Sequence, residues 1–400
     1  MADPEVSRLV ASAPRTPTAG PRERPDVGSF EDIQAAAVRT TGLSDFGDPS
    51  YEEGLRILVD DLASPEAGLT PQGNYFHRAQ VKSALVGRLM TEARFAQFPE
   101  HRDVLIERPI FVTGLPRTGT TALHRLLCAD PAHQGLEAWL TEFPQPRPPR
   151  ETWEGDPIFA ALRSAYQQHH VTNPEFMGIH YMDATSVEEC WRILRQTGKS
   201  IGFESLAHIP RYSAWLAQQD WTDAYERHRR NLQLVGLHDA DKRWVLKNPS
   251  HLVALDALMR VYPDALVVVC HRDPVASIAS ACSLSAEATA GTSTAFIGET
   301  IGATQLEMLS RSWRTFVAAR SAYDQSQFVD VDYRAFVADP VGAVRTIYQC
   351  FDIPWSPEAQ QRVREIDAES RTGKARPRHA YELADYGLTE ERVQGAFTCP

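Results

Sequence analysis

A glycine-bounded loop between a strand-like and a helix-like segment places the strongest constraint on how this chain can fold. Ile110-Phe111-Val112 is a short apolar run that ends close to Gly114, and residues 122–127 have the apolar spacing of a helix. The loop Gly114-Leu115-Pro116-Arg117-Thr118-Gly119-Thr120-Thr121 between them has the G-x-x-x-x-G spacing of a phosphate-binding loop. In such a loop, successive backbone N–H groups and a helix N-terminus point at one phosphate. We therefore predict an anion site at this loop.

Three later segments have the character of further strands. They are residues 243–246, 265–270 and 328–333, and helical patterns lie between them. Residues 265–270 are apolar throughout, which is typical of a central strand that is buried on both faces. The alternation of strands and helices predicts an α/β fold, with a P-loop-type central parallel sheet flanked by helices.

The spacing of these segments divides the chain into three parts. Residues 1–30 hold five prolines and predict a flexible Pro-rich tail. Residues 31–105 have helical spacing and predict an N-terminal helical region, and residues 106–400 carry the loop and the strands. About 130 residues separate the first two strands, far more than the dozen or so that a crossover needs. We therefore expect a large helical insertion over about 131–242.

Charge and apolar runs exclude several classes of function. The 400 residues include 41 Lys and Arg against 52 Asp and Glu, a net charge of −11, so nucleic acid is not an expected partner. The longest apolar run is far shorter than the roughly 20 residues that span a bilayer, and the first residues lack a signal-peptide core. The six cysteines show no zinc spacing. We expect a cytoplasmic protein without a bound metal or a transmembrane segment.

The loop departs from the pattern of enzymes that transfer phosphate from nucleoside triphosphates. Thr120 stands where the lysine for the β- and γ-phosphates would be. His271-Arg272 follows the strand at 265–270, where an acidic residue would hold magnesium. A magnesium-dependent transfer from a triphosphate is therefore not expected.

Three motifs in this order resemble the sulfotransferase superfamily, more its bacterial, actinobacterial-like branch than the cytosolic enzymes. Residues 116–121 are similar to the loop that binds the 5′-phosphosulfate of PAPS (3′-phosphoadenylyl sulfate). Arg272 after a buried strand, with Ser280 eight residues on, resembles the 3′-phosphate motif, and Tyr333 ahead of Asp339-Pro340 resembles the adenine-binding tyrosine. The resemblance implies that PAPS is bound by Pro116, Arg117, Thr118, Gly119, Thr120, Thr121, Arg272, Ser280 and Tyr333.

The resemblance also assigns roles to other cations. Arg117 stands where the cytosolic enzymes have lysine, and arginine keeps its charge and does not donate a proton. We predict that Arg117 stabilises charge on the leaving oxygen. Residues 371–378 replace the Arg-Lys-Gly ending of the cytosolic enzymes. Arg371 and Lys374 in this run would either cover the 3′-phosphate or belong to a solvated surface run, and both readings stay open.

Transfer of a sulfuryl group to an alcohol needs a base near the attacking hydroxyl, and histidine titrates in the suitable range. His251 in Lys247-Asn248-Pro249-Ser250-His251 resembles the family's Lys-x-His segment, with two extra residues between. We predict His251 as the general base and Lys247 near the sulfonate. The reserve candidates are Glu137, Glu142, and Asp183 with His180.

Together these features predict a PAPS-dependent sulfotransferase that uses in-line transfer with a general base. Residues 106–400 would form the PAPS-binding domain, and the insertion over about 131–242 would bind the acceptor. Aromatic residues in the insertion favour a small, hydrophobic, lipid-like alcohol as acceptor. The alternatives are a P-loop nucleotide kinase and a non-catalytic nucleotide-binding protein.

Overall fold

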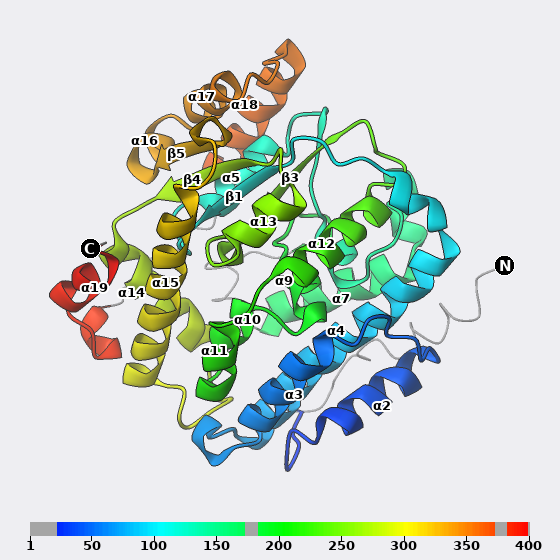
Figure 1. The fold of residues 1–400 in the computed structure, drawn as a ribbon, viewed down its shortest axis with the longest axis vertical. Helices are drawn as coiled ribbons and strands as arrows, with labels where there is room; N and C mark the ends of the chain where they lie inside the picture. Colours follow the sequence, from blue (N-terminus) through cyan, green and yellow to red (C-terminus); the bar gives the residue numbers. More distant parts are fainter. Residues whose placement is uncertain (1–21, 173–182, 373–381, 399–400) are drawn as a thin grey trace.

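A five-stranded parallel sheet forms the centre of the computed structural model, which describes residues 22–172, 183–372 and 382–398 (Figure 1). The strand order is β2-β3-β1-β4-β5, and every pair is parallel. The strands are β1 (Ile110–Gly114), β2 (His133–Gln134), β3 (Arg243–Lys247), β4 (Leu266–His271) and β5 (Phe328–Asp332). The four predicted strands are confirmed to within two residues. β2 was missed because two residues carry no recognisable pattern.

Side chains of the central strands alternate between two hydrophobic cores. In β1 and β4, Phe111 and Val267 face the larger core. Val112 and Val268 face the smaller one. Because both faces are covered, these strands are apolar throughout.

Helices cover both faces of the sheet (Figure 1). The smaller core lies against α5 (Thr120–Leu127), α16 (Tyr333–Ala338), α17 (Pro340–Cys350) and α18 (Pro357–Thr372). The larger core lies against α12 (Thr222–Val235), α13 (Leu255–Val261), α14 (Pro274–Ala288), α15 (Gly298–Arg320) and α19 (Glu390–Phe397). The predicted α/β fold is therefore confirmed.

The helices and strands in the described part of the predicted insertion are all helices apart from β2. Its helices include α6 (Ala138–Glu142), α7 (Pro157–Thr172), α9 (Trp191–Leu194), α10 (Ile201–Glu204), α11 (Pro210–Leu216) and α12. Leu85 of the N-terminal region and Trp139 and Phe203 of the insertion belong to the same hydrophobic core. The N-terminal region and the insertion thus form one continuous layer rather than separate bodies.

The N-terminal region begins earlier than the sequence suggested. It consists of α2 (Phe30–Thr41), α3 (Tyr51–Leu62) and α4 (Pro71–Gln97). Ahead of α2, Arg24 donates its backbone N–H to Pro71 O at 2.9 Å, and Val27 is only 1% exposed. The predicted tail over 1–30 is therefore too long, because residues 22–29 already pack on α4. Residues 1–21 lie outside the described part.

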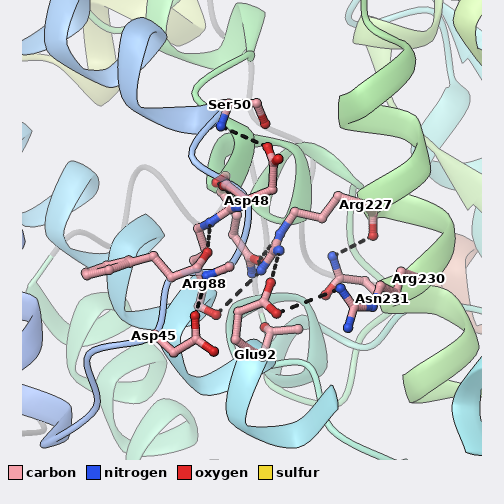
Figure 2. A network of polar contacts seen from close by, with 12 residues as sticks. Asp45, Asp48, Ser50, Arg88, Glu92, Arg227, Arg230 and Asn231 are labelled. Carbon is pink, nitrogen blue, oxygen red and sulfur yellow. Dashed lines mark hydrogen bonds and ion pairs between the residues drawn. The ribbon is translucent and has the colours of Figure 1, made fainter. Parts of the chain in front are cut away.

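A buried ionic network ties α4 to α12 and to the loop before α3 (Figure 2). Arg88 donates from Nε to Phe46 O at 2.6 Å and also to the Asp48 carbonyl. One turn along α4, Glu92 forms ion pairs with Arg227 and, at 3.8 Å, with Arg230 of α12. This network fastens the N-terminal helices to the insertion. Among the described residues, every helix is too short or too polar to span a membrane.

Candidate functional site

The phosphate-type loop leaves β1 at the middle of the sheet, between β3 and β4. Gly114 and Gly119 have φ values of 147° and 86°, in the region that favours glycine. A Cβ at Gly114 would lie 2.5 Å from Cys270 O, and one at Gly119 would lie 3.2 Å from the Tyr333 ring. Gly119 precedes α5 without a side-chain cap, so the first N–H groups of α5 remain available to an anion. The loop thus lies at the point where parallel α/β sheets place ligands, and its binding of an anion stays a prediction.

The predicted nucleotide-binding residues are brought together beside this loop. Arg272, just after β4, donates from Nη1 to Arg117 O at 2.7 Å, and its guanidinium lies 4.5 Å from the centre of the Tyr333 ring. Arg117 donates from Nε to Ser280 Oγ of α14 at 3.2 Å. Two guanidinium groups, a hydroxyl and an aromatic ring therefore surround one edge of the loop. Arg117 reaches the predicted 3′-phosphate serine, a contact that the sequence did not suggest.

Lys247 at the end of β3 occupies the other edge of the loop. It is only 2% exposed, and its Nζ donates to Thr121 Oγ1 at 3.1 Å. The same ammonium forms an ion pair with Glu189, ahead of α9. Lys247 O also accepts the backbone N–H of Cys190 at 3.1 Å, which holds the Glu189 segment against β3. Glu189 was not predicted, because no motif or spacing in the insertion distinguishes it from other acidic residues.

A cavity of about 250 Å³ begins where the loop meets Glu189. Pro116 of the loop lines it, and its polar lining residues are Glu188, Glu189, Ser205, Asn248, Ser285 and Gln305. Asn248 is 2% exposed, and its Nδ2 has no hydrogen-bond partner among the described residues. The apolar part is lined by Trp191, Ile201, Leu206, Ala281, Leu284, Met308 and Leu309. A mostly apolar cavity with a few polar groups is the usual form of a small-molecule site.

His251 does not line this cavity, so the structure does not support its predicted role as general base. It is 0% exposed, its Nδ1 is hydrogen-bonded to Tyr225 Oη at 2.6 Å, and its ring packs edge-on against Phe111. Burial, with the nearby His228 and Lys247 charges, lowers the pKa of His251 well below its ordinary value of 6.5. The two extra residues ahead of it form a short turn, Pro249–His251, that carries the imidazole into the core.

The reserve carboxylates serve structural contacts. Glu137 pairs with Arg147 at 3.1 Å, and Asp183 accepts from the backbone N–H and hydroxyl of Thr185. Glu142 pairs with Arg192 and Arg195 at 2.6 and 2.5 Å. Burial alone would raise the pKa of Glu142, but the two arginines lower it to about 2. His180, Lys374 and the Arg371 side chain lie outside the described part.

Comparisons with known proteins agree with this geometry. The family described as "Sulfotransferase family" matches residues 109–357. A curated protein of Mycobacterium tuberculosis, omega-hydroxy-beta-dihydromenaquinone-9 sulfotransferase Stf3, is 25% identical over 256 residues, which span 62% of this chain and 63% of that protein. The crystal structure of sulfotransferase STF1 from Mycobacterium tuberculosis H37Rv covers 94% of this chain and 99% of its own, with 52% identity and a TM-score of 0.87. Sulfotransferase STF9 from Mycobacterium avium covers 94% and 96%, with 31% identity and a TM-score of 0.84.

Proposed function

Because this chain belongs to the sulfotransferase family, we propose that it transfers the sulfuryl group of PAPS to the hydroxyl of a small apolar alcohol. The observation that carries this proposal is the contact between Lys247 and both Thr121 and Glu189. It joins the phosphate-type loop to the apolar cavity through one buried cation. A donor in the loop and an alcohol in the cavity would therefore meet at Lys247.

Residues of the loop and its nearest edge suit the groups of PAPS. The free N–H groups at the start of α5 and the backbone of residues 116–121 would hold the 5′-phosphosulfate. Arg272 and Ser280 would hold the 3′-phosphate, and Tyr333, already in contact with the Arg272 guanidinium, would lie against the adenine. When bound, PAPS supplies a sulfuryl group attached to a phosphate leaving group.

Arg117 and Lys247 would stabilise the charge that develops during transfer. Arg117 carries its guanidinium on the loop itself, so its charge lies close to any anion held there. Lys247 is fixed by two partners in a buried position, and a preorganised cation in a dry site stabilises a transition state more strongly than one in water. Neither residue needs to move a proton in this scheme.

Glu189 is the group that we propose as general base, in place of His251. Its carboxylate lines the cavity and is oriented by Lys247. It would accept the proton of the acceptor hydroxyl as the oxygen attacks sulfur opposite the leaving phosphate oxygen. Asn248 Nδ2, buried at the cavity without a partner in the described chain, would donate to that hydroxyl oxygen and orient it.

The cavity lining favours an acceptor with an apolar body. Most of its lining side chains are aliphatic or aromatic, and only a few of them, Glu189 among them, can form hydrogen bonds. The name of the curated relative from Mycobacterium tuberculosis describes the sulfation of a hydroxylated menaquinone, which is a lipid-like alcohol. Both observations support a hydrophobic alcohol for this chain.

Transfer of label from [³⁵S]PAPS tests the proposal. The full-length chain would be incubated without magnesium with octanol, farnesol and glucose, and the products identified by mass spectrometry. We expect sulfate esters of the apolar alcohols and little label on glucose. Magnesium-dependent turnover of ATP in place of sulfation would favour a nucleotide kinase. Tight binding of adenosine 3′,5′-bisphosphate without transfer to any alcohol would favour a non-catalytic binding protein.

A further inference from the structure

A second, larger cavity lies away from the phosphate-type loop, between α2, α4 and α7. Its volume is about 670 Å³, within the range of about 300–1,000 Å³ that is usual for pockets that bind small organic ligands. It shares no lining residue with the cavity beside Glu189. We refer to it below as the α4 groove.

One side of α4 gives the α4 groove two chemically different ends. Arg78, Lys82, Val86 and Met90 all line it and follow one another at four-residue intervals. Residues with this spacing form a stripe along one helix face, and twelve residues of helix extend about 18 Å. The stripe is cationic at its start and apolar at its end. It is therefore complementary to an elongated amphiphile that has an anionic head and an apolar chain.

The cationic end holds more positive charge than its surroundings neutralise. Arg39 of α2 and Lys82 form no hydrogen bond or ion pair with any described residue, and both line the groove. Arg78 donates to the carbonyl oxygens of Val27 and Asp32, at 2.9 and 3.3 Å, rather than to a carboxylate. Partial burial and the charges of Arg78 and Arg39 lower the pKa of Lys82. Cations that repel one another in a partly dry site are stabilised by a bound anion.

The carboxylate that lines the groove does not supply this anion. Both oxygens of Glu142 are taken, by Ser83, Arg192 and Arg195. The charge at this end is unusual in a chain whose net charge is −11.

α7 adds further apolar side chains to the lining of the groove. Ile158 is buried, Leu162 is half-buried, and both face the groove together with Ala161, Ala165 and the ring of Phe143. These side chains line the same groove as Val86 and Met90 of α4. They form a surface that suits an alkyl or prenyl chain rather than a polar molecule.

We propose that the α4 groove binds an amphiphile with an anionic head and one apolar chain. The head lies on Arg39, Arg78 and Lys82, and the chain follows α4 toward Met90. Residues 1–21 are a weaker fit as occupant, because two acidic and two basic side chains leave them without the excess of negative charge that this end attracts.

Calorimetric titration of the full-length chain with dodecyl phosphate, below its micelle concentration, tests the proposal. Two comparison ligands separate the contributions of head and chain: dodecyl maltoside has the same chain with a neutral head, and inorganic phosphate is a head alone. We expect one dodecyl phosphate per chain and binding at least about tenfold weaker for each comparison ligand.

Substitutions locate the binding. The double variant Arg39→Gln/Lys82→Gln should weaken dodecyl phosphate binding about tenfold or more and leave dodecyl maltoside unaffected. Both side chains lack hydrogen-bond and ion-pair partners among the described residues, so the fold should tolerate the change. Arg364→Gln on the exposed side of α18 removes the same type of charge elsewhere and should change nothing. Leu162→Asp should weaken dodecyl phosphate more than inorganic phosphate.

Four results would overturn the proposal. Unchanged binding by the double variant would place the ligand elsewhere, including the phosphate-type loop. Equal affinity for dodecyl maltoside would indicate a purely apolar groove, and equal affinity for inorganic phosphate would indicate a simple anion site. If the chain binds no dodecyl phosphate, the occupant of the groove would be the residues before Arg22 or a second copy of the chain.

Discussion

The two edges of the phosphate-type loop are built in different ways. The edge that we propose binds the nucleotide is called the nucleotide edge. It is built on consecutive residues, 114–121, and on backbone groups whose positions follow from the strand, the loop and the helix. The edge beside Lys247, where we propose that the alcohol binds, is called the acceptor edge. Its residues Glu189, Asn248 and Met308 come from distant parts of the chain and meet only through folding. A site made of backbone can be recognised in a sequence, whereas a site made of side chains from distant elements cannot.

The largest expected effect is a loss of turnover on changing the acceptor edge. Glu189→Gln should lower kcat by about 10²–10⁴-fold, since it removes the proposed base while keeping the size of the side chain. Binding of adenosine 3′,5′-bisphosphate should change little, because Glu189 faces the cavity. Steady-state kinetics with [³⁵S]PAPS and calorimetry measure both. Glu188→Gln, which also alters a cavity carboxylate, is the matched control.

One contrary result would favour His251 as the general base. If Glu189→Gln kept full turnover while His251→Gln lost it with an unchanged melting temperature, the assignment from the structure would be wrong and the sequence-based one right.

The next effect concerns the nucleotide edge. Arg117→Ala should lower kcat by about 10²–10³-fold, because losing one preorganised contact to developing charge typically costs roughly 2.7–4 kcal/mol. Arg117→Lys keeps the charge without the guanidinium fork and should recover part of the rate. Single-turnover measurements would separate this effect from product release. A kcat close to that of the unmodified chain would exclude a role for Arg117 in transfer.

Acid should weaken the ion pairs that Glu142 of α6 makes with Arg192 and Arg195 in the helical layer. The folded chain holds the pKa of Glu142 at about 2 against 4.5 in its ordinary range, so its ion pairs stabilise the fold above pH 4.5 and are lost as the pH falls toward 2. The loss should be on the order of 1–3 kcal/mol in the free energy of unfolding. Urea denaturation at a series of pH values measures it. Glu142→Gln should be less stable at neutral pH and should lack this part of the pH dependence. An identical pH profile for both chains would contradict the prediction.

The smallest effect tests the selectivity of the nucleotide edge. Arg272→Ala should reduce the preference for adenosine 3′,5′-bisphosphate over ADP by about tenfold or more, and Ser280→Ala should reduce it less. Taking the ratio of the two affinities removes any general loosening of the loop through the Arg117 carbonyl. Arg125→Ala on α5 controls for the loss of a nearby positive charge. An unmodified chain that binds ADP and the bisphosphate equally would contradict the PAPS proposal itself.

The contrast between the two edges of the loop explains which features could be predicted from the sequence. The family, the fold class, the four longer strands and the loop were predicted and are confirmed, since each rests on consecutive residues. The assembly of Arg117, Arg272, Ser280 and Tyr333 agrees with the predicted motifs, while their roles stay predictions. His251 lies in the core and does not line the cavity beside Glu189, which its spacing from Lys247 does not reveal, and its role as base stays a prediction. Glu189 was missed because only the folded contact with Lys247 marks it.

Arg117 stands at φ 70°, a conformation in which glycine is the comfortable residue. Holding an ordinary side chain there typically costs about 1–3 kcal/mol, and the hydrogen bond from Arg272 to the Arg117 carbonyl helps to fix it. A designer who optimised this chain for melting temperature alone would therefore place glycine at position 117 and lose the guanidinium. With the role in transfer that we propose for Arg117, this arginine would represent a trade-off between stability and activity. Substitutions intended to raise the melting temperature of this protein should therefore keep Arg117 and be placed in the helical layers away from the loop.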